Sequence, residues 1–373
     1  MTIFLIFFTL IILYFIIEKR INDSCLASFT AVIHVNGIRG KTSTCRYLDA
    51  ALRTKYRVFT KTTGTDAKMI DVSGREIPVH RLGPANIHEQ LRVIRRARRE
   101  GAEILILECM AVNPELQKTA QEQIVKSNIT VITNVRYDHI FEMGDTLEEI
   151  AASLSSTIPE NGTLYTADAN AASLFDDVCR KRNCRLVLCP GTGTVSENIG
   201  IAQAVSASLG IAKEDFLKSL PEMKEDFGSR HLYQLKNEKG EIFHFLNLFS
   251  ANDPQSTRNL VEEARGSCSR LFFLYNHRED RPDRALLFAR HFFPHYPDAT
   301  VFLTGHGAPL PKRLFASAGI RDLRVLTDCR SCLFAMPAGA LLIGIGNIKG
   351  SGYRLIRELE AQEAASSSDF SYK

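Results

Sequence analysis

The chain has 373 residues, of which 45% are apolar, so it has room for two domains with cores of ordinary size. Its net charge of +4 is too small to indicate a nucleic-acid partner, and the sequence contains no nucleic-acid-binding motif. Nine scattered cysteines, an odd number, fit a reducing compartment, and the lone Cys329-Arg-Ser-Cys332 spacing lacks the second pair that a zinc site needs.

The first predicted element is a membrane anchor. The segment Ile3–Ile17 is uncharged and almost wholly apolar, and with Met1 and Thr2 it reaches the short end of the roughly 17 to 25 residues of a membrane span. Positive charge follows this segment rather than preceding it, which argues against a cleaved signal peptide. The same charges place everything after Arg20 in the cytoplasm. We expect a single-pass inner-membrane anchor over residues 1–20; the alternative is a buried core helix.

A phosphate-binding turn is predicted shortly after the anchor. The apolar run Ala31–Val35 predicts a buried strand, and a helix follows the turn up to Leu52. The helix start presents N–H groups and about half a positive charge to an anion. Lys41 can reach the β- and γ-phosphates of a nucleotide, and the Thr42 hydroxyl can hold Mg²⁺. The alternative is a chance match in an ordinary strand–helix turn. The expected nucleotide-binding residues are Asn36, Gly37, Gly40, Lys41, Thr42 and Ser43.

Polar side chains end the strands that follow. A strand over 56–60 leads into a hydroxyl-rich turn that contains Thr63, and a strand over 103–108 ends in Glu108. The strand over 129–134 ends in Asn134, and Asp138 and His139 come just beyond it. Because parallel strands direct their carboxyl ends to one edge, these groups are expected near Lys41. The predicted metal ligands are Thr42, Thr63, Glu108 and His139. An ordinary turn is the alternative for Thr63.

A basic helix is predicted over 86–99. Its arginines are Arg92, Arg95, Arg96, Arg98 and Arg99. We expect a solvated basic face there, and the alternative is contact with a polyanion or with a membrane surface.

Alternating strands and helices predict an α/β fold in two parts. We expect a parallel-sheet ATP-binding domain over residues 21–227, with its boundary in the charged segment 221–228. A smaller Rossmann-like α/β domain is expected over 228–360, followed by a flexible tail over 361–373. Predicted strands of the second domain lie at 242–247, 270–275, 299–303, 323–326 and 340–344.

These motifs together resemble the Mur ligase superfamily, the ATP-dependent amide ligases that include folylpolyglutamate synthase. The carrying segments are 36–43, Glu108, 134–139, 227–230 and 250–257. The resemblance implies that His139 is associated with a second Mg²⁺ and that Arg230 meets the γ-phosphate. It also implies that Asn134 belongs to the nucleotide site and that Asp253 contacts the nucleotide.

The chain is more specifically similar to the PgsB/CapB family of poly-γ-glutamate synthase ligase subunits. The carrying segments are 36–41, 61–67, 83–86, Glu108-Cys-Met-Ala-Val-Asn-Pro114, 251–253, 278–284 and 346–348. The resemblance implies an ATP- and Mg²⁺-dependent ligase that converts a glutamate γ-carboxylate to an acyl phosphate and joins it to the amine of another glutamate. Lys41, Arg230 and His139 are its expected catalytic residues, and membrane proteins are its expected partners.

An acidic substrate and a polyanionic product give a role to Arg278, Arg281 and Arg284, with a solvated charged turn as the alternative. Other functions remain open at this point. They are a ligase that acts on a soluble, folate-like acceptor, a kinase that stops at phosphate transfer, and a membrane-tethered nucleotide-binding protein without catalysis.

Overall fold

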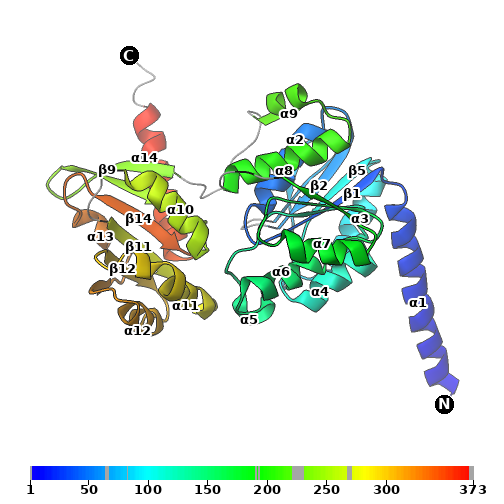
Figure 1. Ribbon diagram of the computed structural model, residues 1–373, viewed down its shortest axis with the longest axis horizontal. Helices are drawn as coiled ribbons and strands as arrows, with labels where there is room; N and C mark the ends of the chain where they lie inside the picture. The colour runs from blue at the N-terminus through cyan, green and yellow to red at the C-terminus, as the bar shows by residue number, and fades with distance from the viewer. Residues whose placement is uncertain are drawn as a thin grey trace. The chain divides into compact units, whose positions relative to one another are not determined.

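The structure is a computed structural model that describes residues 2–63, 67–81, 83–189, 191, 194–220, 231–266 and 271–368. The chain divides into two compact units, each built on its own sheet (Figure 1). Unit 1 contains Met1–Val135 and Glu142–Met223, and unit 2 contains Arg136–Phe141 and Lys224–Lys373. The predicted α/β class is confirmed in both units. The domain boundary expected at 221–228 lies outside the described residues.

Unit 1 is organised around a sheet with the strand order β4-β3-β2-β5-β1-β6-β7-β8. The strands are β1 (Ala31–Asn36), β2 (Val58–Thr62), β3 (Lys68–Ile70), β4 (Glu76–Pro78), β5 (Ile104–Glu108), β6 (Ile129–Ile132), β7 (Thr163–Thr166) and β8 (Arg185–Leu188). Strands β2, β5, β1, β6, β7 and β8 are parallel, as the alternating pattern predicted. The antiparallel β3 and β4 were not predicted, because each has only three residues and neither alternates clearly.

Helices cover both faces of this sheet. The helices of unit 1 are α1 (Thr2–Leu26), α2 (Lys41–Leu52), α3 (Glu89–Arg99), α4 (Pro114–Thr119), the π-helix η1 (Ala120–Val125), α6 (Leu147–Ser155), α7 (Ala172–Lys181), α8 (Thr194–Ser208) and α9 (Lys213–Ser219). Alternate residues of β1 divide between the two faces. Ile33 packs with α2, α8 and α9, whereas Val32 packs with α3, η1 and the end of α1. The unit therefore has three layers, with the core on both sides of the sheet.

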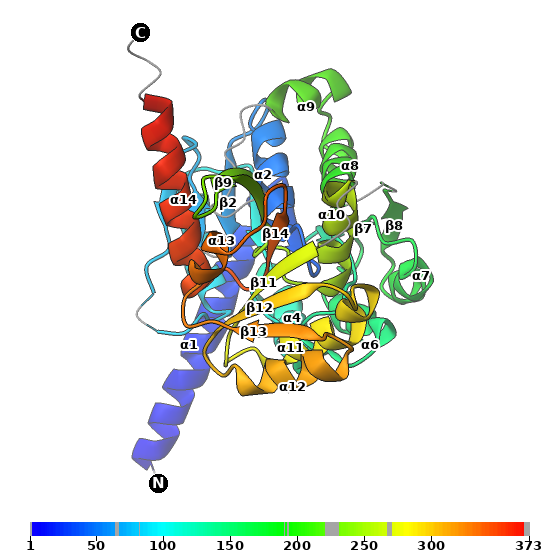
Figure 2. The ribbon, with the colours of Figure 1, turned by 90° about the vertical axis from the view of Figure 1, so that its left-hand side faces the viewer.

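Helix α1 differs from the other helices of unit 1. By length and composition it is long and apolar enough to cross a membrane, and its apolar residues are exposed. Figures 1 and 2 show its N-terminal part projecting away from the sheet of unit 1. Its other end packs into the unit, where Asn22 and Cys25 are buried and Asn22 Nδ2 donates to the Ile124 carbonyl at 2.8 Å. One continuous helix thus forms both the exposed apolar segment and part of the core.

Unit 2 contains a smaller sheet with the order β13-β12-β11-β14-β10-β9. The strands are β9 (His231–Lys236), β10 (Ile242–Asn247), β11 (Leu271–His277), β12 (Thr300–Gly305), β13 (Asp322–Val325) and β14 (Leu341–Gly346). The helices are α10 (Pro254–Arg265), α11 (Pro282–His291), the 3₁₀ helix η3 (Phe293–His295), α12 (Pro309–Ser317), α13 (Ser331–Phe334) and α14 (Ser351–Ser368). Helices α10, α11 and α12 pack on one face, and α13 and α14 pack on the other. The short α5 (Ile140–Met143) lies where the chain passes between the units.

Two features of unit 2 differ from expectation. Strand β9 pairs antiparallel with β10 at the edge of the sheet and was not predicted. Helix α14 continues to Ser368, although we expected a frayed tail from Ala361. The sequence Ala-Gln-Glu-Ala-Ala contains good helix formers, so continuation of the helix costs little.

Candidate functional site

The phosphate loop joins β1 to α2 and requires glycine at two positions. Gly37 has φ +119° and Gly40 has φ +82°, in the region that side-chain-bearing residues rarely adopt. A Cβ on Gly37 would lie 2.1 Å from Thr133 Oγ1, and one on Gly40 would lie 2.2 Å from Asn198 Nδ2. The loop is therefore fixed by its contacts as well as by its own backbone. The predicted strand, turn and helix occur as expected.

The end of β6 supports this loop. Asn134 uses both ends of its amide on Arg39: its Oδ1 accepts from the Arg39 N–H at 3.0 Å, and its Nδ2 donates to the Arg39 carbonyl at 3.1 Å. Asn36 is buried, accepts from the Gly37 N–H at 2.8 Å and donates to Gln117 Oε1 at 2.8 Å. Both asparagines, predicted to bind the nucleotide, hold the backbone of the loop in this structure.

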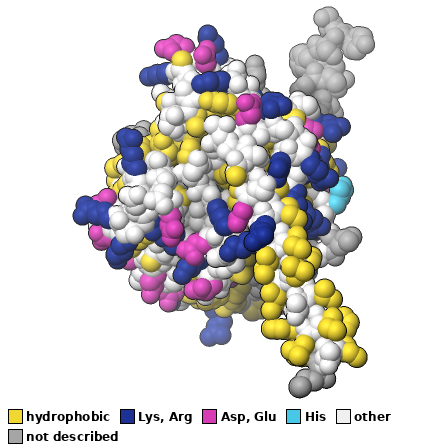
Figure 3. All heavy atoms as spheres, turned by 90° about the vertical axis from the view of Figure 1, so that its right-hand side faces the viewer, with side chains coloured by type: hydrophobic (Ala, Val, Ile, Leu, Met, Phe, Trp, Pro, Cys, Tyr) yellow, Lys and Arg dark blue, Asp and Glu magenta, His cyan; other side chains and the backbone are white. Residues whose placement is uncertain are grey.

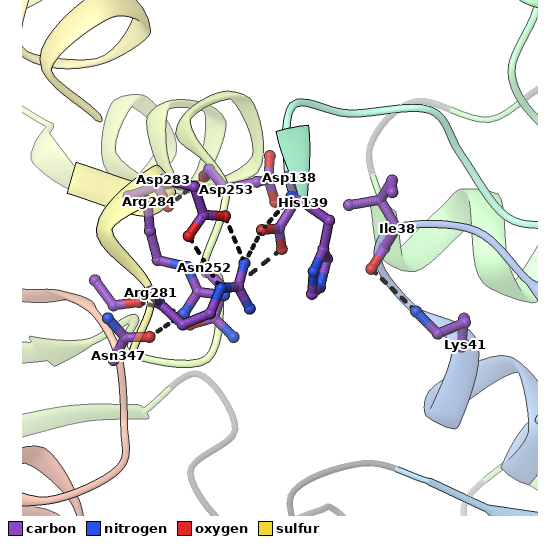
Figure 4. A network of polar contacts seen from close by, with 12 residues as sticks. Ile38, Lys41, Asp138, His139, Asn252, Asp253, Arg281, Asp283, Arg284 and Asn347 are labelled. Atoms are coloured by element: carbon purple, nitrogen blue, oxygen red, sulfur yellow. Dashed lines mark hydrogen bonds and ion pairs between the residues drawn. The ribbon is translucent and has the colours of Figure 1, made fainter. Parts of the chain in front are cut away.

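Lys41 opens α2 with its ammonium group folded over the loop. Its Nζ donates to the Gly37 carbonyl at 2.7 Å and lies 3.4 Å from the Ile38 carbonyl, a contact drawn in Figure 4. Ser43 is exposed in the first turn of the helix. A cation, the start of a helix and a glycine turn thus meet at one place, which is the arrangement that binds phosphate.

A hydroxyl and a buried carboxylate meet beside the loop. The Thr42 hydroxyl lies 3.0 and 3.1 Å from the two Glu108 oxygens, and the Thr63 N–H donates to Glu108 Oε2 at 2.7 Å. Thr63 therefore contacts Glu108 through its backbone rather than through the hydroxyl that we expected to face the metal. Glu108 is only 2% exposed because β5 lies between β1 and β2 in the middle of the sheet.

These groups fit a magnesium site completed by a nucleotide. Within the described ranges, no three His, Cys, Asp or Glu side chains are grouped so that they could hold a metal alone. One carboxylate and one hydroxyl beside a phosphate loop are what Mg²⁺ uses when phosphates and water supply its remaining ligands. The residues present therefore suit Mg²⁺ carried by a nucleotide better than a metal held only by protein.

A buried lysine near this edge was missed by the sequence analysis. Lys61 in β2 is fully buried, and its Nζ lies 2.6 Å from Glu89 Oε1; Arg81 also pairs with Glu89, at 2.7 Å. Burial lowers the pKa of Lys61, and the Glu89 carboxylate opposes that shift. The neighbouring Gln90 donates to the Glu108 carbonyl at 3.3 Å, so the start of α3 is fastened to the strand that carries the metal candidate. A charged residue inside an otherwise buried strand was the available signal.

The Asp138-His139 pair belongs to unit 2 and not to the unit that contains β6. Asp138 is buried and pairs with Arg281 and, at 3.6 Å, with Arg284 (Figure 4). The adjacent Tyr137 stacks on His291, with ring centroids 4.3 Å apart. His139 adopts φ +54°, and its N–H donates to Asp138 Oδ1 at 2.9 Å.

The three arginines of the 278–284 turn are not equivalent. Arg278 pairs with the exposed neighbouring Asp280. Burial alone would lower the pKa of Arg281, but Asp283 and Asp138 raise it above its usual value. Arg284 is 4% exposed and donates to Asn347 and, at 3.2 Å, to Asn252 Oδ1. The alternative of a solvated turn is therefore wrong for Arg284.

Asp253 and Arg230 are the two other residues that the resemblance placed at the nucleotide. Asp253 is buried and caps α10, where its Oδ1 accepts from the Ser256 N–H at 2.8 Å. Arg230 lies outside the described residues. In unit 1 the structure brings together Lys41, Thr42 and Glu108, with Thr63 reaching Glu108 through its backbone. In unit 2 it groups Asp138 with Arg281 and Arg284.

Comparison with known proteins gives the family. Residues 35–216 match the Mur ligase middle domain, and residues 232–362 match the poly-gamma-glutamate synthase CapB C-terminal domain. PGA synthase CapB of Bacillus subtilis is 32% identical over 370 residues, covering 92% of this chain and 94% of that protein. Capsule biosynthesis protein CapB of Bacillus anthracis is 32% identical over 372 residues, covering 93% of this chain and 80% of that protein.

Solved structures share the fold. E. coli FolC in complex with ADP matches with a TM-score of 0.70 at 12% identity, covering 93% of each chain. The bifunctional folylpolyglutamate synthase/dihydrofolate synthase of Yersinia pestis, complexed with AMPPNP and Mn, matches with a TM-score of 0.67 at 13% identity, covering 92% of each chain. The chain belongs to the CapB family of poly-gamma-glutamate synthases, which has the Mur ligase fold.

Proposed function

We propose that this protein is an ATP-dependent amide ligase that joins the γ-carboxylate of one glutamate to the amine of another and so builds poly-γ-glutamate. The observation that carries the proposal is the phosphate loop of Lys41 beside the Thr42–Glu108 pair. Relatives named PGA synthase and capsule biosynthesis protein, each 32% identical, support the choice of glutamate.

The reaction has two steps. A γ-carboxylate oxygen attacks the γ-phosphorus of ATP, and ADP leaves, so that an acyl phosphate forms. The amine of a second glutamate then attacks the acyl carbon and loses a proton, and inorganic phosphate leaves. The amide product and the two released species are those of an ADP-forming ligase.

Unit 1 contributes charge and position to the first step. The Lys41 ammonium now contacts two loop carbonyls, and it can turn to a γ-phosphate that enters the loop. Its charge then stabilises the negative charge that develops on the transferring phosphoryl group. Thr42 and Glu108 would hold Mg²⁺, whose contribution is to neutralise phosphate charge. Asn134 and Asn36 keep the loop in its binding conformation.

We assign unit 2 to the glutamate side of the reaction. Arg278 is partly exposed, and its partner among the described residues is the neighbouring Asp280, so it suits contact with an acidic substrate. Arg281 and Arg284 act through Asp138, which fixes the segment that carries His139. The predicted role of His139 with a second Mg²⁺ and that of Arg230 at the γ-phosphate are part of this proposal.

Helix α1 provides the proposed attachment to the inner membrane. Its apolar residues are exposed over the first 16 positions that the structure describes, from Thr2 to Ile17. Lys19 and Arg20 come two and three residues after Ile17, which orients the body to the cytoplasm. A tethered ligase can pass its polymer to membrane-protein partners for export.

The proposal is tested with membranes that contain the full chain and its partners, supplied with ATP, Mg²⁺ and labelled glutamate. We expect glutamate-dependent release of ADP and phosphate together with a ladder of γ-linked oligomers. AMP and pyrophosphate as products would contradict the mechanism. Transfer of glutamate only to an added folate-like acceptor would support the alternative ligase.

Lys41→Ala provides the local test. It should abolish phosphate release while membrane attachment and folding persist, because Lys41 is only partly buried at the start of α2 and is not part of the core. Lys118→Ala, which removes an exposed lysine of α4 in the same unit, is the matched control and should retain activity. Polymer synthesis at a normal rate by Lys41→Ala would refute the assignment of the loop.

A further inference from the structure

Helix α1 and helix α3 are joined by the arginines of α3. Arg95 pairs with Glu18 at 3.2 Å, and Arg98 donates to Ser24 Oγ at 2.9 Å. Arg96 pairs instead with Glu100 at 2.8 Å and lies against the Phe59 ring. All three arginines therefore make contacts within unit 1. The expected solvated face is wrong for Arg95 and Arg96, which are partly buried, whereas Arg98 is exposed.

The other two arginines of α3 make no such contacts with the described residues. Arg92 and Arg99 are exposed, and within the part of the chain that the structure describes neither has a hydrogen bond or an ion pair. They are seven residues apart, two helical turns, and so lie on the same side of α3. Lys19 and Arg20 of α1 are likewise exposed and unpaired among the described residues. Figure 3 shows Lys and Arg side chains gathered around the end of the apolar helix that enters the body.

The length of α1 determines how close this surface lies to the membrane. The apolar run Ile3–Ile17 spans about 22 Å at about 1.5 Å per residue, less than the roughly 30 Å of a bilayer hydrocarbon core. The next residue, Glu18, already contacts Arg95 of the body. The helix continues without a break to Leu26, so no linker separates the span from the body. A span this short, joined this directly, holds the adjoining surface of the body at the depth of the lipid headgroups.

We infer that Lys19, Arg20, Arg92 and Arg99 form a docking surface for anionic lipid headgroups around the base of α1. The inference rests on the proposed insertion of α1 into a membrane. Charge complementarity selects the occupant, because four unpaired cations at headgroup depth attract anionic lipids over zwitterionic ones. Arg95 and Arg98 hold α3 against α1, so Arg92 and Arg99 stay in position as part of one rigid element.

The chain offers a direct spectroscopic test because it contains no tryptophan. His88 is exposed and lies one helical turn before Arg92, so His88→Trp places a single reporter beside the surface. The full-length protein is reconstituted in phosphatidylcholine vesicles that contain a trace of dansyl-labelled lipid, either phosphatidylglycerol or phosphatidylcholine. We expect stronger energy transfer from the introduced indole to the anionic probe than to the zwitterionic probe, and salt should weaken the difference.

Arg92→Gln/Arg99→Gln in the reporter background should remove most of this selectivity, since each cation near an anionic surface contributes about a fivefold factor. Lys181→Gln/Arg185→Gln is the matched control. It removes the same charge from two exposed positions at α7 and β8, which Figure 2 shows far from α1, and selectivity should persist. The inference would be overturned by equal energy transfer to both probes in the reporter variant that keeps both arginines. It would also be overturned if the two double variants lost selectivity to the same extent.

Two further outcomes are distinguished in the same system. Tyr14→Trp, made separately, reports insertion through quenching by lipids brominated in mid-chain; absence of quenching would refute the anchor, and the surface with it. Quenching of Tyr14→Trp together with equal transfer from the His88→Trp reporter would refute only the headgroup surface. If soluble polyglutamate abolishes the selectivity at constant ionic strength, the arginines bind the polymer, and the lipid assignment is overturned.

Discussion

The Gly40→Ala substitution tests whether the phosphate loop has the shape that ATP binding requires. Gly40 and Gly74 have nearly the same positive backbone angle φ, +82° and +84°. Their surroundings differ, because a Cβ on Gly40 would lie 2.2 to 2.6 Å from three atoms of the buried Asn198 side chain. The nearest atom to a Cβ on Gly74 is 4.0 Å away. The pair therefore separates the cost of the backbone conformation from the cost of the collision.

The free-energy costs of the two substitutions follow from these distances. An alanine in the left-handed region costs about 1–2 kcal/mol at either position. Forcing an extra carbon into a packed site adds roughly 1–3 kcal/mol at Gly40 only. If the loop escapes this collision by leaving its binding conformation, about 2 kcal/mol appears as a thirtyfold weaker affinity for ATP. Gly74 lies outside the loop, so Gly74→Ala should lower stability slightly and leave ATP affinity unchanged.

The assay is equilibrium binding of a fluorescent ATP analogue to the full chain in detergent. Gly40→Ala/Asn198→Ala removes the side chain that the new Cβ would meet, and it should bind about thirtyfold more tightly than Gly40→Ala. Asn198→Ala alone should bind like the unsubstituted protein. The reasoning is refuted if Gly40→Ala and the double variant bind ATP equally well.

Three further perturbations address the carboxylate, the buried pair and the buried histidine. Glu108→Gln should raise the Mg²⁺ concentration needed for half-maximal phosphate release by about 10- to 100-fold, whereas Glu103→Gln, at the other end of the same strand segment, should not change it. Lys61→Met should lower the thermal midpoint by the equivalent of about 3 kcal/mol, and Lys61→Met/Glu89→Gln should recover part of the loss. Burial lowers the pKa of His34 to about 4, so the unfolded chain binds this proton first and stability should fall from pH 6.5 towards pH 4. His34→Gln should flatten that part of a pH series of urea unfolding curves; an unchanged slope would contradict the assignment.

Local sequence was enough to predict the loop, and contacts between distant residues explain what it missed. A buried strand, two glycines and a Lys-Thr helix start determine their own geometry within a dozen positions. Lys61 is different, because its charge is tolerated inside β2 only through Glu89, which lies on another element. The partner could not be identified without the fold that brings α3 beside β2.

The basic helix shows the same limitation. Periodicity places the five arginines on one side of α3, opposite its buried residues, but it does not say which of them meet another helix. The division into arginines that contact α1 and arginines that do not depends on where α1 enters the unit. Membrane contact, one of the two alternatives for this helix, is therefore proposed only for Arg92 and Arg99, which are unpaired among the described residues.

The Asp138-His139 pair carries the main consequence of the fold for the candidate site. Its position just after β6 suggested that it would join Glu108 in one group of strand-end ligands. Within unit 2, Asp138 pairs with Arg281 and Arg284, more than 140 positions later in the chain, and Tyr137 stacks on His291. The candidate metal residues are therefore divided between the units, with Thr42 and Glu108 in unit 1 and His139 in unit 2. A substitution of Arg281 should then act through the placement of His139, and not only through contact with an acidic substrate.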